Sequence, residues 1–353
     1  MPVFPTSPFL AFRALLLLGA ILVDPLAAES TVPFRLTLPT ENDGLFTKNN
    51  ERFYMYTMRN FEGEVSHPWT AGQYGFVRDQ KRTSEGVILT RFHEGIDIRP
   101  LRRDNANRPL DIVKPVAAGT VMYVNQTASH SSYGKYAIIE HPFPEGPLYS
   151  LYAHLMSVEV SAGQSVTTSS RIGRLGYTGE GIDIVRAHVH VELNLLLSKR
   201  FEVWHDRYYR SANPHGLYNG LNLTGLNIAV LLLDSRKEQP LSLAAHFARL
   251  VPYFRVAVPK KGSMEILQRY PCLGKNLHLA EGAPSWEIHF TREGIPVAIV
   301  PYPERVSAPV VTWVDHSDTY HSYKTRGYLT GSGSKASLTT SGLQYVQLVT
   351  GQF

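Results

Sequence analysis

The chain has 353 residues, of which 43% are hydrophobic and 18% charged, enough for one large or two ordinary globular domains. Its single cysteine, Cys272, excludes an intrachain disulfide and any zinc site that needs two or more cysteines. The formal net charge of +5 lies in short, scattered basic groups without interleaved aromatic residues, which argues against a nucleic-acid-binding protein.

Residues 1–28 have the features of a secretory signal peptide. An apolar run from Ala14 to Val23 follows Arg13, is too short to span a membrane, and is followed by small residues. We expect cleavage after Ala28, export to the periplasm, cell envelope or exterior of a bacterium, and no stable membrane insertion afterwards. A retained membrane anchor is the alternative.

Residues 29–69 are mixed and polar, and they predict a lead-in segment outside the core. Between about residues 70 and 200, short β-rich runs alternate with glycine-containing turns, a spacing typical of an all-β core. The polar insert at residues 99–111 contains proline and predicts a surface loop. The expected strands are residues 119–126, 135–141, 148–155, 164–168 and 187–197.

A second pattern begins after residue 235. Residues 242–254 have the period of a helix, and residues 285–290, 295–302 and 308–314 predict strands. We therefore expect a domain at residues 70–235 and a β-rich or α+β accessory unit at residues 236–353. That unit either positions the protein on its target or covers one end of a groove; the alternative is that it extends and stabilises the first sheet.

The stretch "FHEGIDI" resembles the H-E-x-x-H helix of zinc peptidases, but Asp97 stands where the second histidine would be. Gly95 costs a helix interior about 1 kcal/mol relative to alanine, and Ile96 and Ile98 are β-branched. In an extended chain, His93 and Asp97 lie on one side and the two isoleucines on the other. The stretch therefore predicts one strand that carries two ligands of a metal site.

A zinc ion held by these two residues needs at least a third protein ligand, with the fourth position open for water in a catalytic site. The run "AHVHVEL" places His188, His190 and Glu192 on one face of a strand, with apolar residues on the other. His154 in "LYAHL" ends another apolar strand. Glu94 points away from Asp97 in an extended chain, so it is not expected to act as a base.

The order of "HEGID", "PVAAGTV", "YAHL", "GQSV", "RIGRLGYTG" and "AHVHVEL" resembles the lysostaphin-type (LytM-like) zinc metallopeptidases of bacterial cell walls. The resemblance covers roughly residues 70–195 and implies a mainly β fold, with an antiparallel β-sheet groove and ligands on groove-facing strands. The insert at residues 99–111 is longer than the family pattern, and Tyr74 stands in place of phenylalanine. By motif position, the implied Zn²⁺ ligands are His93, Asp97 and His190, and the implied catalytic residues are His188 and His154.

The function that the resemblance implies is that of a secreted zinc endopeptidase. Such an enzyme hydrolyses peptide bonds in the cross-links or stem peptides of peptidoglycan by means of metal-activated water. His188 would act as base or orient the water, and His154 would donate to the oxyanion or the leaving amine, although the two roles are interchangeable. Glu192 either orients a histidine or is an exposed carboxylate at a strand end.

Two other functions are compatible with the motifs. One is a catalytically silent envelope factor that binds wall peptides or activates a partner amidase. The other is an exported peptidase that acts on proteins. The complete ligand set favours an enzyme over the silent factor, and a comparison of peptidoglycan with casein as substrates would separate the two kinds of peptidase.

Overall fold

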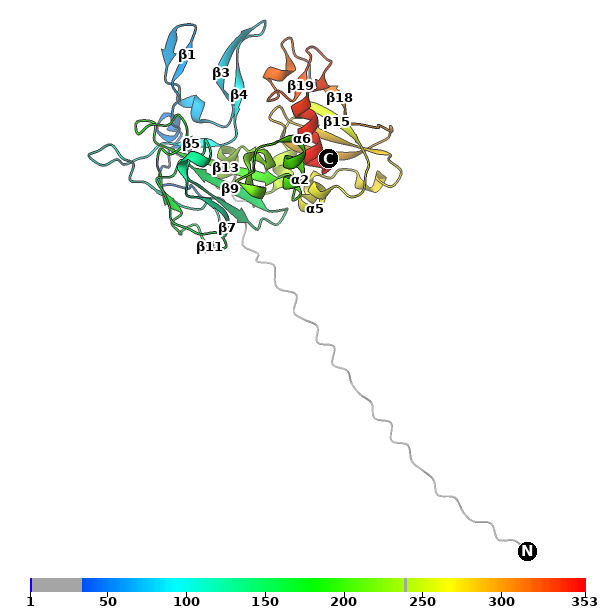
Figure 1. Ribbon diagram of the computed structural model, residues 1–353, viewed down its shortest axis with the longest axis horizontal. Helices are drawn as coiled ribbons and strands as arrows, with labels where there is room; N and C mark the ends of the chain where they lie inside the picture. The colour runs from blue at the N-terminus through cyan, green and yellow to red at the C-terminus, as the bar shows by residue number, and fades with distance from the viewer. Residues whose placement is uncertain (2–33, 238–239) are drawn as a thin grey trace. The chain divides into compact units, whose positions relative to one another are not determined.

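The computed structural model describes Met1 and residues 34–237 and 240–353 (Figure 1). Residues Phe34–Phe353 form one compact unit. The expected signal peptide, apart from Met1, lies outside the described residues. Among the helices of the described ranges, none combines the length and apolar character that a membrane crossing needs.

A seven-stranded antiparallel sheet forms the centre of this unit and confirms the mainly β fold class. Its order is β11-β7-β8-β9-β13-β14, and β5 pairs with β13 as well. Figure 1 shows β5, β9 and β13 side by side. The strands are β5 (Ile96–Ile98), β7 (Gly119–Asn125), β8 (Tyr136–His141), β9 (Leu148–Ala153), β11 (Ser165–Val166), β13 (Val189–Leu196) and β14 (Leu223–Leu226).

Strand β13 is buried along its whole length. Side chains alternate between the two faces of a strand, so Val191 and Leu193 face the apolar core while His190, Glu192 and Asn194 share the other face. Buried polar side chains need hydrogen-bond partners. The polar face of β13 is therefore the place in the fold where a functional site can form.

Smaller β elements flank the central sheet. β3 (Gly75–Thr83) and β4 (Gly86–His93) form a hairpin whose register shifts between Phe76 and Arg78, which marks a β-bulge. β1 (Arg59–Phe61) pairs with β2 (Glu64–Ser66). A three-stranded sheet has the order β10-β12-β6, with β6 (Ile112–Val113), β10 (Ser157–Val158) and β12 (Gly173–Arg174).

The C-terminal part contains a second antiparallel sheet of order β17-β16-β15-β18. The run at residues 242–254, expected to be helical, is helical only up to Ala248, and a strand begins at Phe254. Pro252 explains the early end, because proline disfavours helical backbone at the residue before it. The remaining bounds are α1 (Asn50–Phe53), α2 (Phe201–Tyr208), α3 (Ile228–Asp234), α4 (Leu243–Ala248), β15 (Phe254–Pro259), α5 (Glu265–Arg269), β16 (Ser285–Phe290), β17 (Pro296–Tyr302), β18 (Val310–Val314), β19 (Leu329–Thr330), β20 (Ser337–Leu338) and α6 (Thr340–Thr350).

The hydrophobic core is continuous across residue 235. The Tyr270 hydroxyl accepts from the Leu196 amide at 2.9 Å and donates to the Pro147 carbonyl at 2.9 Å. At the other end of the chain, Leu36, Phe53 and Met55 are buried, so the expectation that residues 29–69 stay outside the core is wrong for residues 36–55, whereas none of residues 56–69 is buried. The boundary near residue 235 remains a prediction.

The β3–β4 hairpin is held at its tip by the C-terminal part. The Glu85 carboxylate accepts from the Ser317 hydroxyl at 3.2 Å, the Thr319 amide at 3.1 Å and the Lys324 ammonium at 2.5 Å. The Ser84 hydroxyl donates to the Asp318 carbonyl at 3.2 Å. Residues 317–324 therefore act as a brace for the hairpin.

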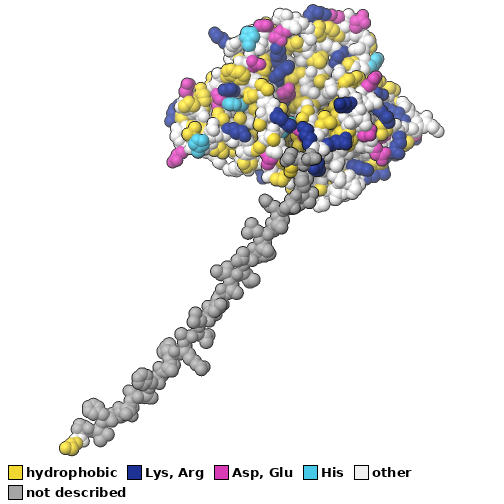
Figure 2. All heavy atoms as spheres, turned by 180° about the vertical axis from the view of Figure 1, so that it is seen from behind, with side chains coloured by type: hydrophobic (Ala, Val, Ile, Leu, Met, Phe, Trp, Pro, Cys, Tyr) yellow, Lys and Arg dark blue, Asp and Glu magenta, His cyan; other side chains and the backbone are white. Residues whose placement is uncertain are grey.

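The opposite face of the molecule shows basic, acidic and apolar side chains interspersed (Figure 2). This distribution agrees with the short, scattered basic groups of the sequence.

We predict that Tyr270→Phe destabilises the whole unit. The substitution leaves the buried Leu196 amide and Pro147 carbonyl without their partner, a loss of about 1–3 kcal/mol in the free energy of unfolding. Urea denaturation measures it, with the exposed Tyr320→Phe as matched control. Stability equal to that of the unmodified protein would contradict a structural role for this contact.

We also predict that His246 makes the fold acid-sensitive. Burial, followed by the charge of Arg249, lowers its pKa from 6.5 to about 4. The unfolded chain takes up a proton as the pH falls through 6.5 and the folded chain does not, so stability is lost between about pH 6.5 and pH 4. At pH 5 this histidine accounts for about 2 kcal/mol of lost stability.

The test is His246→Leu, compared with the unmodified protein by urea denaturation at pH 7.5 and pH 5.0. Neither ring nitrogen of His246 has a hydrogen-bond partner in the described part of the chain, so leucine costs little at pH 7.5. The decrease in the free energy of unfolding between pH 7.5 and pH 5.0 should be about 2 kcal/mol smaller in His246→Leu than in the unmodified protein. An unchanged loss would show that another group carries the acid sensitivity.

Candidate metal and catalytic site

Three strands bring the predicted metal ligands together. His93 ends β4, Asp97 lies in β5, and His190 lies in β13 directly opposite Asp97 in the β5–β13 register. The expected single strand is wrong, because Glu94 and Gly95 separate β4 from β5. Gly95 passes so close to β13 that a Cβ there would lie 2.3 Å from the Val191 carbonyl oxygen.

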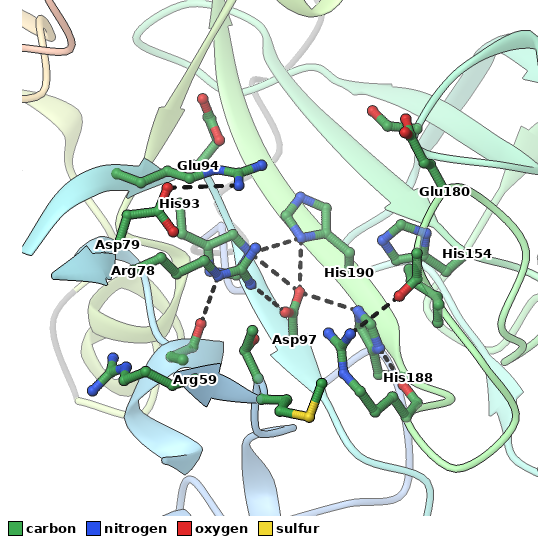
Figure 3. Close-up of a pocket in the computed structure, with 18 of the residues that line it drawn as sticks. Arg59, Arg78, Asp79, His93, Glu94, Asp97, His154, Glu180, His188 and His190 are labelled. Atoms are coloured by element: carbon green, nitrogen blue, oxygen red, sulfur yellow. Dashed lines mark hydrogen bonds and ion pairs between the residues drawn. The ribbon is translucent and has the colours of Figure 1, made fainter. Parts of the chain in front are cut away.

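The three donor atoms converge on one buried point (Figure 3). His93 Nε2 lies 3.1 Å from Asp97 Oδ1, His190 Nδ1 lies 2.9 Å from the same oxygen, and the two ring nitrogens are 3.0 Å apart. All three side chains are at most 6% exposed. The expectation that His93 and Asp97 share one space is confirmed.

Hydrogen bonds on the far side of each ring fix the direction of its lone pair. The Gln73 carbonyl can only accept, so His93 donates from Nδ1 at 2.7 Å and turns the Nε2 lone pair toward Asp97. His190 donates from Nε2 to Glu192 at 2.9 Å, which leaves Nδ1 facing the same point. Two nitrogens and a carboxylate oxygen that face one another favour a cation between them.

The two other predicted histidines lie beside this point. His188 donates from Nδ1 to the Arg186 carbonyl at 2.6 Å, and its Nε2 lies 3.5 Å from Asp97 Oδ1. His154 donates from Nδ1 to the Thr178 carbonyl at 2.9 Å. The centroids of these two rings are 4.8 Å apart. His154 has φ of 61°, a left-handed conformation that non-glycine residues adopt uncommonly.

Burial sets the charge of these rings. It lowers the pKa of His188 to about 4 and, together with the neighbouring histidines, holds the pKa of His154 well below its usual range. Both rings are therefore neutral at pH 7 and able to accept a proton. Burial lowers the pKa of His190 too, but its bonds to Asp97 and Glu192 outweigh burial and raise the pKa to about 9. A metal that binds His190 must displace this proton.

Arg78 is a site residue that sequence reasoning missed. Its Nη2 donates to Asp97 Oδ2 at 2.5 Å and its Nε donates to the Ala71 carbonyl at 2.9 Å. Burial alone would raise the pKa of Asp97, but His93, His188 and Arg78 hold it well below its usual range. The bulge in β3 turns Arg78 into the site, and a bulge cannot be inferred from strand alternation.

Tyr133 was also missed, and Glu192 was left between two interpretations. Glu192 is 1% exposed and accepts from the Tyr133 hydroxyl at 2.6 Å and the Asn194 amide at 2.9 Å, besides His190. It therefore orients a histidine and is not an exposed carboxylate at a strand end. Glu94 bonds Arg326 at 2.9 Å and points away from Asp97 (Figure 3), as expected.

The site lies in a cleft of about 670 Å³ that β1, β3, β4 and the loop at residues 180–186 border. All five predicted residues line it. Two imidazoles and one carboxylate form a donor set typical of catalytic zinc, with one further coordination position left for water. The residues present fit a zinc ion, with Glu192 and Arg78 as the groups that orient its ligands.

Residues 91–200, less than a third of the chain, match the family model described as peptidase family M23. A zinc-containing peptidase from Vibrio cholerae is 23% identical, with 40% of this chain and 36% of that chain covered and a TM-score of 0.25. A LytM protein from Ruminococcus gnavus is 27% identical, with 29% and 39% covered and a TM-score of 0.24. The catalytic domain of lysostaphin from Staphylococcus simulans is 19% identical, with 39% and 79% covered and a TM-score of 0.24.

The chain thus spans well under half of the first two of these proteins. No curated protein matches it. The family match falls on the segment that carries His93, Asp97, His154, His188 and His190. Residues 91–200 are thus similar to peptidase family M23, in agreement with the resemblance to the LytM-like metallopeptidases that the sequence motifs indicate.

We predict that the purified protein binds about one zinc ion and that Asp97→Ala removes most of it. The loss follows because Asp97 supplies the only carboxylate among the three converging ligands. Metal analysis after dialysis measures it, and Asp104→Ala, in the exposed insert, is the control. Full zinc retention by Asp97→Ala would contradict the ligand assignment.

Proposed function

We propose that the protein is an exported zinc endopeptidase that hydrolyses peptide bonds of peptidoglycan, in its cross-links or stem peptides. The observation that carries the proposal is the convergence of His93, Asp97 and His190 on one buried point, with the neutral rings of His154 and His188 beside it. A family M23 domain supports the peptidase class and this kind of substrate.

The residues around the site have different roles in the proposed peptide hydrolysis. A zinc ion bound by His93, Asp97 and His190 would polarise the peptide carbonyl and lower the pKa of a water molecule. His188, whose Nδ1 proton is held by a carbonyl, presents its Nε2 lone pair toward the ligands and can accept the proton of that water. His154, fixed in the same way, also has an unprotonated Nε2; after this nitrogen has accepted the proton released by the water, it can donate to the oxyanion or pass the proton to the leaving amine.

Hydrogen bonds around the site limit its rearrangement during the reaction. Arg78 holds one oxygen of Asp97, so the other oxygen stays turned toward the histidines. Glu192, itself bonded by Tyr133, fixes the ring of His190. Preorganised groups of this kind reduce the reorganisation that a developing charge would otherwise require.

The alternative function is a catalytically silent envelope factor that binds wall peptides or activates a partner amidase. Such a protein has no need of two neutral histidines aimed at a complete ligand set. Incubation of the purified protein with sacculi and with casein, followed by mass spectrometry, separates the possibilities. Release of peptide-cleaved wall fragments supports the proposal, cleavage of casein alone supports a protein-directed peptidase, and binding without release supports the silent factor.

We predict that His154→Ala and His188→Ala keep the fold and the zinc but lower turnover by roughly 10²–10⁴-fold, the range typical of losing an acid–base group. Turnover on soluble wall peptides and zinc content are measured together. His246→Ala, a histidine outside the cleft, serves as control for turnover. Loss of zinc from either variant would place that histidine among the ligands and reverse the assignment of His188 and His190.

A further inference from the structure

Two arginines line the cleft without a carboxylate partner. Arg59 lies in β1, and Arg186 precedes the catalytic candidate His188 by two residues. In the described part of the chain, Arg59 donates to the Val77 carbonyl at 2.8 Å and Arg186 to the Gly181 carbonyl at 3.2 Å, and neither forms an ion pair. Nε of Arg186 is buried and has no hydrogen-bond partner there.

Most other charged groups of the cleft lining are paired. Arg78 bonds Asp97, Arg91 faces Asp79 at 3.8 Å, and Glu94 bonds Arg326 from outside the lining at 2.9 Å. Glu180 is the one acidic lining residue with no ion pair among the described residues. The charges of the paired groups cancel. The unpaired Arg59 and Arg186 contribute two positive charges and Glu180 one negative charge, so the cleft lining together with Arg326 has a net charge of one positive unit. A bound Zn²⁺ ion would add two more.

The loop that carries Arg186 is fixed at several points. Asp183 accepts from the Arg186 amide at 2.8 Å. Arg103, in the long insert at residues 99–111, donates to the Ile184 carbonyl at 2.6 Å and the Val185 carbonyl at 3.1 Å. The insert therefore holds this wall of the cleft, and it gives the guanidinium of Arg186 a defined position.

Arg186 also lies next to the reacting groups. Its carbonyl accepts the Nδ1 proton of His188 at 2.6 Å, so one residue orients the catalytic ring and places a cation at the cleft wall. Figure 3 places Arg59 on the side of Asp97 opposite His154. A peptide that lies across the metal ligands would thus meet a cation on either side.

A guanidinium that is partly removed from water without a counter-ion is costly for the free protein, and an anionic ligand offsets that cost. The guanidinium group matches a carboxylate in shape and donates two parallel hydrogen bonds to it. We propose that the cleft selects peptides with a free carboxylate close to the scissile bond, with Arg186 as the main carboxylate anchor and Arg59 as a second one. The selectivity rests on the proposed peptidase function and narrows its substrates to acidic peptides.

The experiment compares stem peptides isolated from sacculi with the same peptides after their carboxylates are converted to carboxamides. We expect kcat/KM to fall about 10-fold or more on amidation, the discrimination expected from the loss of a charged hydrogen-bonded pair. Arg186→Gln should lose most of this preference, mainly through a higher KM for the acidic peptides, so that its kcat/KM values for acidic and amidated peptides become similar. Arg186→Lys keeps the charge but not the paired donors, so it should retain part of the preference for acidic peptides that Arg186→Gln loses.

The control is Arg305→Gln, an exposed arginine outside the cleft lining, which should keep the full preference. Arg59→Gln should lose a smaller part than Arg186→Gln. Equal cleavage of acidic and amidated peptides, or an undiminished preference in Arg186→Gln, overturns the selectivity and leaves the peptidase function standing.

If neither kind of peptide is cleaved, the proposed peptidase function is wrong, and the selectivity is then tested by measuring peptide binding. Fluorescence polarisation with labelled acidic and amidated stem peptides measures it on the unmodified protein and on Arg186→Gln. At least about 10-fold weaker binding of acidic peptides by Arg186→Gln, with amidated peptides unaffected, supports the carboxylate anchor. Equal binding by both proteins overturns it.

Discussion

The carboxylate of Asp97 is buried where four strands meet, and the architecture of the site follows from the need to stabilise this charge. A buried carboxylate is costly unless it is paired and hydrogen-bonded. Asp97 in β5 meets Arg78 from β3, His93 from β4 and His190 from β13. Arg78 bonds the Oδ2 atom of this carboxylate, and His93 and His190 face its Oδ1 atom. The same contacts that stabilise the charge therefore fix the position of the β3–β4 hairpin and leave one oxygen available to a metal.

The hairpin connects this charge to the C-terminal part of the chain. At the tip of the hairpin, Glu85 accepts hydrogen bonds from residues 317–324, and at its base Glu94, the neighbour of His93, bonds Arg326. The guanidinium of Arg326 also lies 4.9 Å from the centroid of the Phe92 ring. The segment after residue 235 thus contacts, through the hairpin, the strand that carries His93, although it contributes none of the three candidate metal ligands. This favours its role as a support of the central sheet over that of a separate targeting module.

Local patterns predicted the parts of the site that depend on one strand at a time. Alternation in "AHVHVEL" placed His190 and Glu192 on one face, and the family motifs identified all five residues. The break at Gly95 was not predictable, because it arises from the approach of β13, which lies almost a hundred residues away. Arg78 was missed because a bulge, not alternation, sets its direction. The burial of Phe53 was missed because the apolar run that it begins, residues 53–56, is short and follows polar residues, so it gives no sign of the core that covers it.

Backbone carbonyls, more than side chains, fix the orientation of the histidines. The main-chain oxygens of Gln73, Thr178 and Arg186 accept hydrogen bonds from three of these rings, those of His93, His154 and His188 respectively. A substitution at one of the three acceptor residues keeps the hydrogen bond, because the acceptor is the backbone. A shift of the loop backbone breaks it. The loop after Thr178 passes so close to His154 that a Cβ at residue 179 would lie 3.1 Å from its Nδ1, and φ there is 106°, which favours glycine. The glycine that follows Thr178 is thus explained by the close passage of loop backbone over the ring of His154.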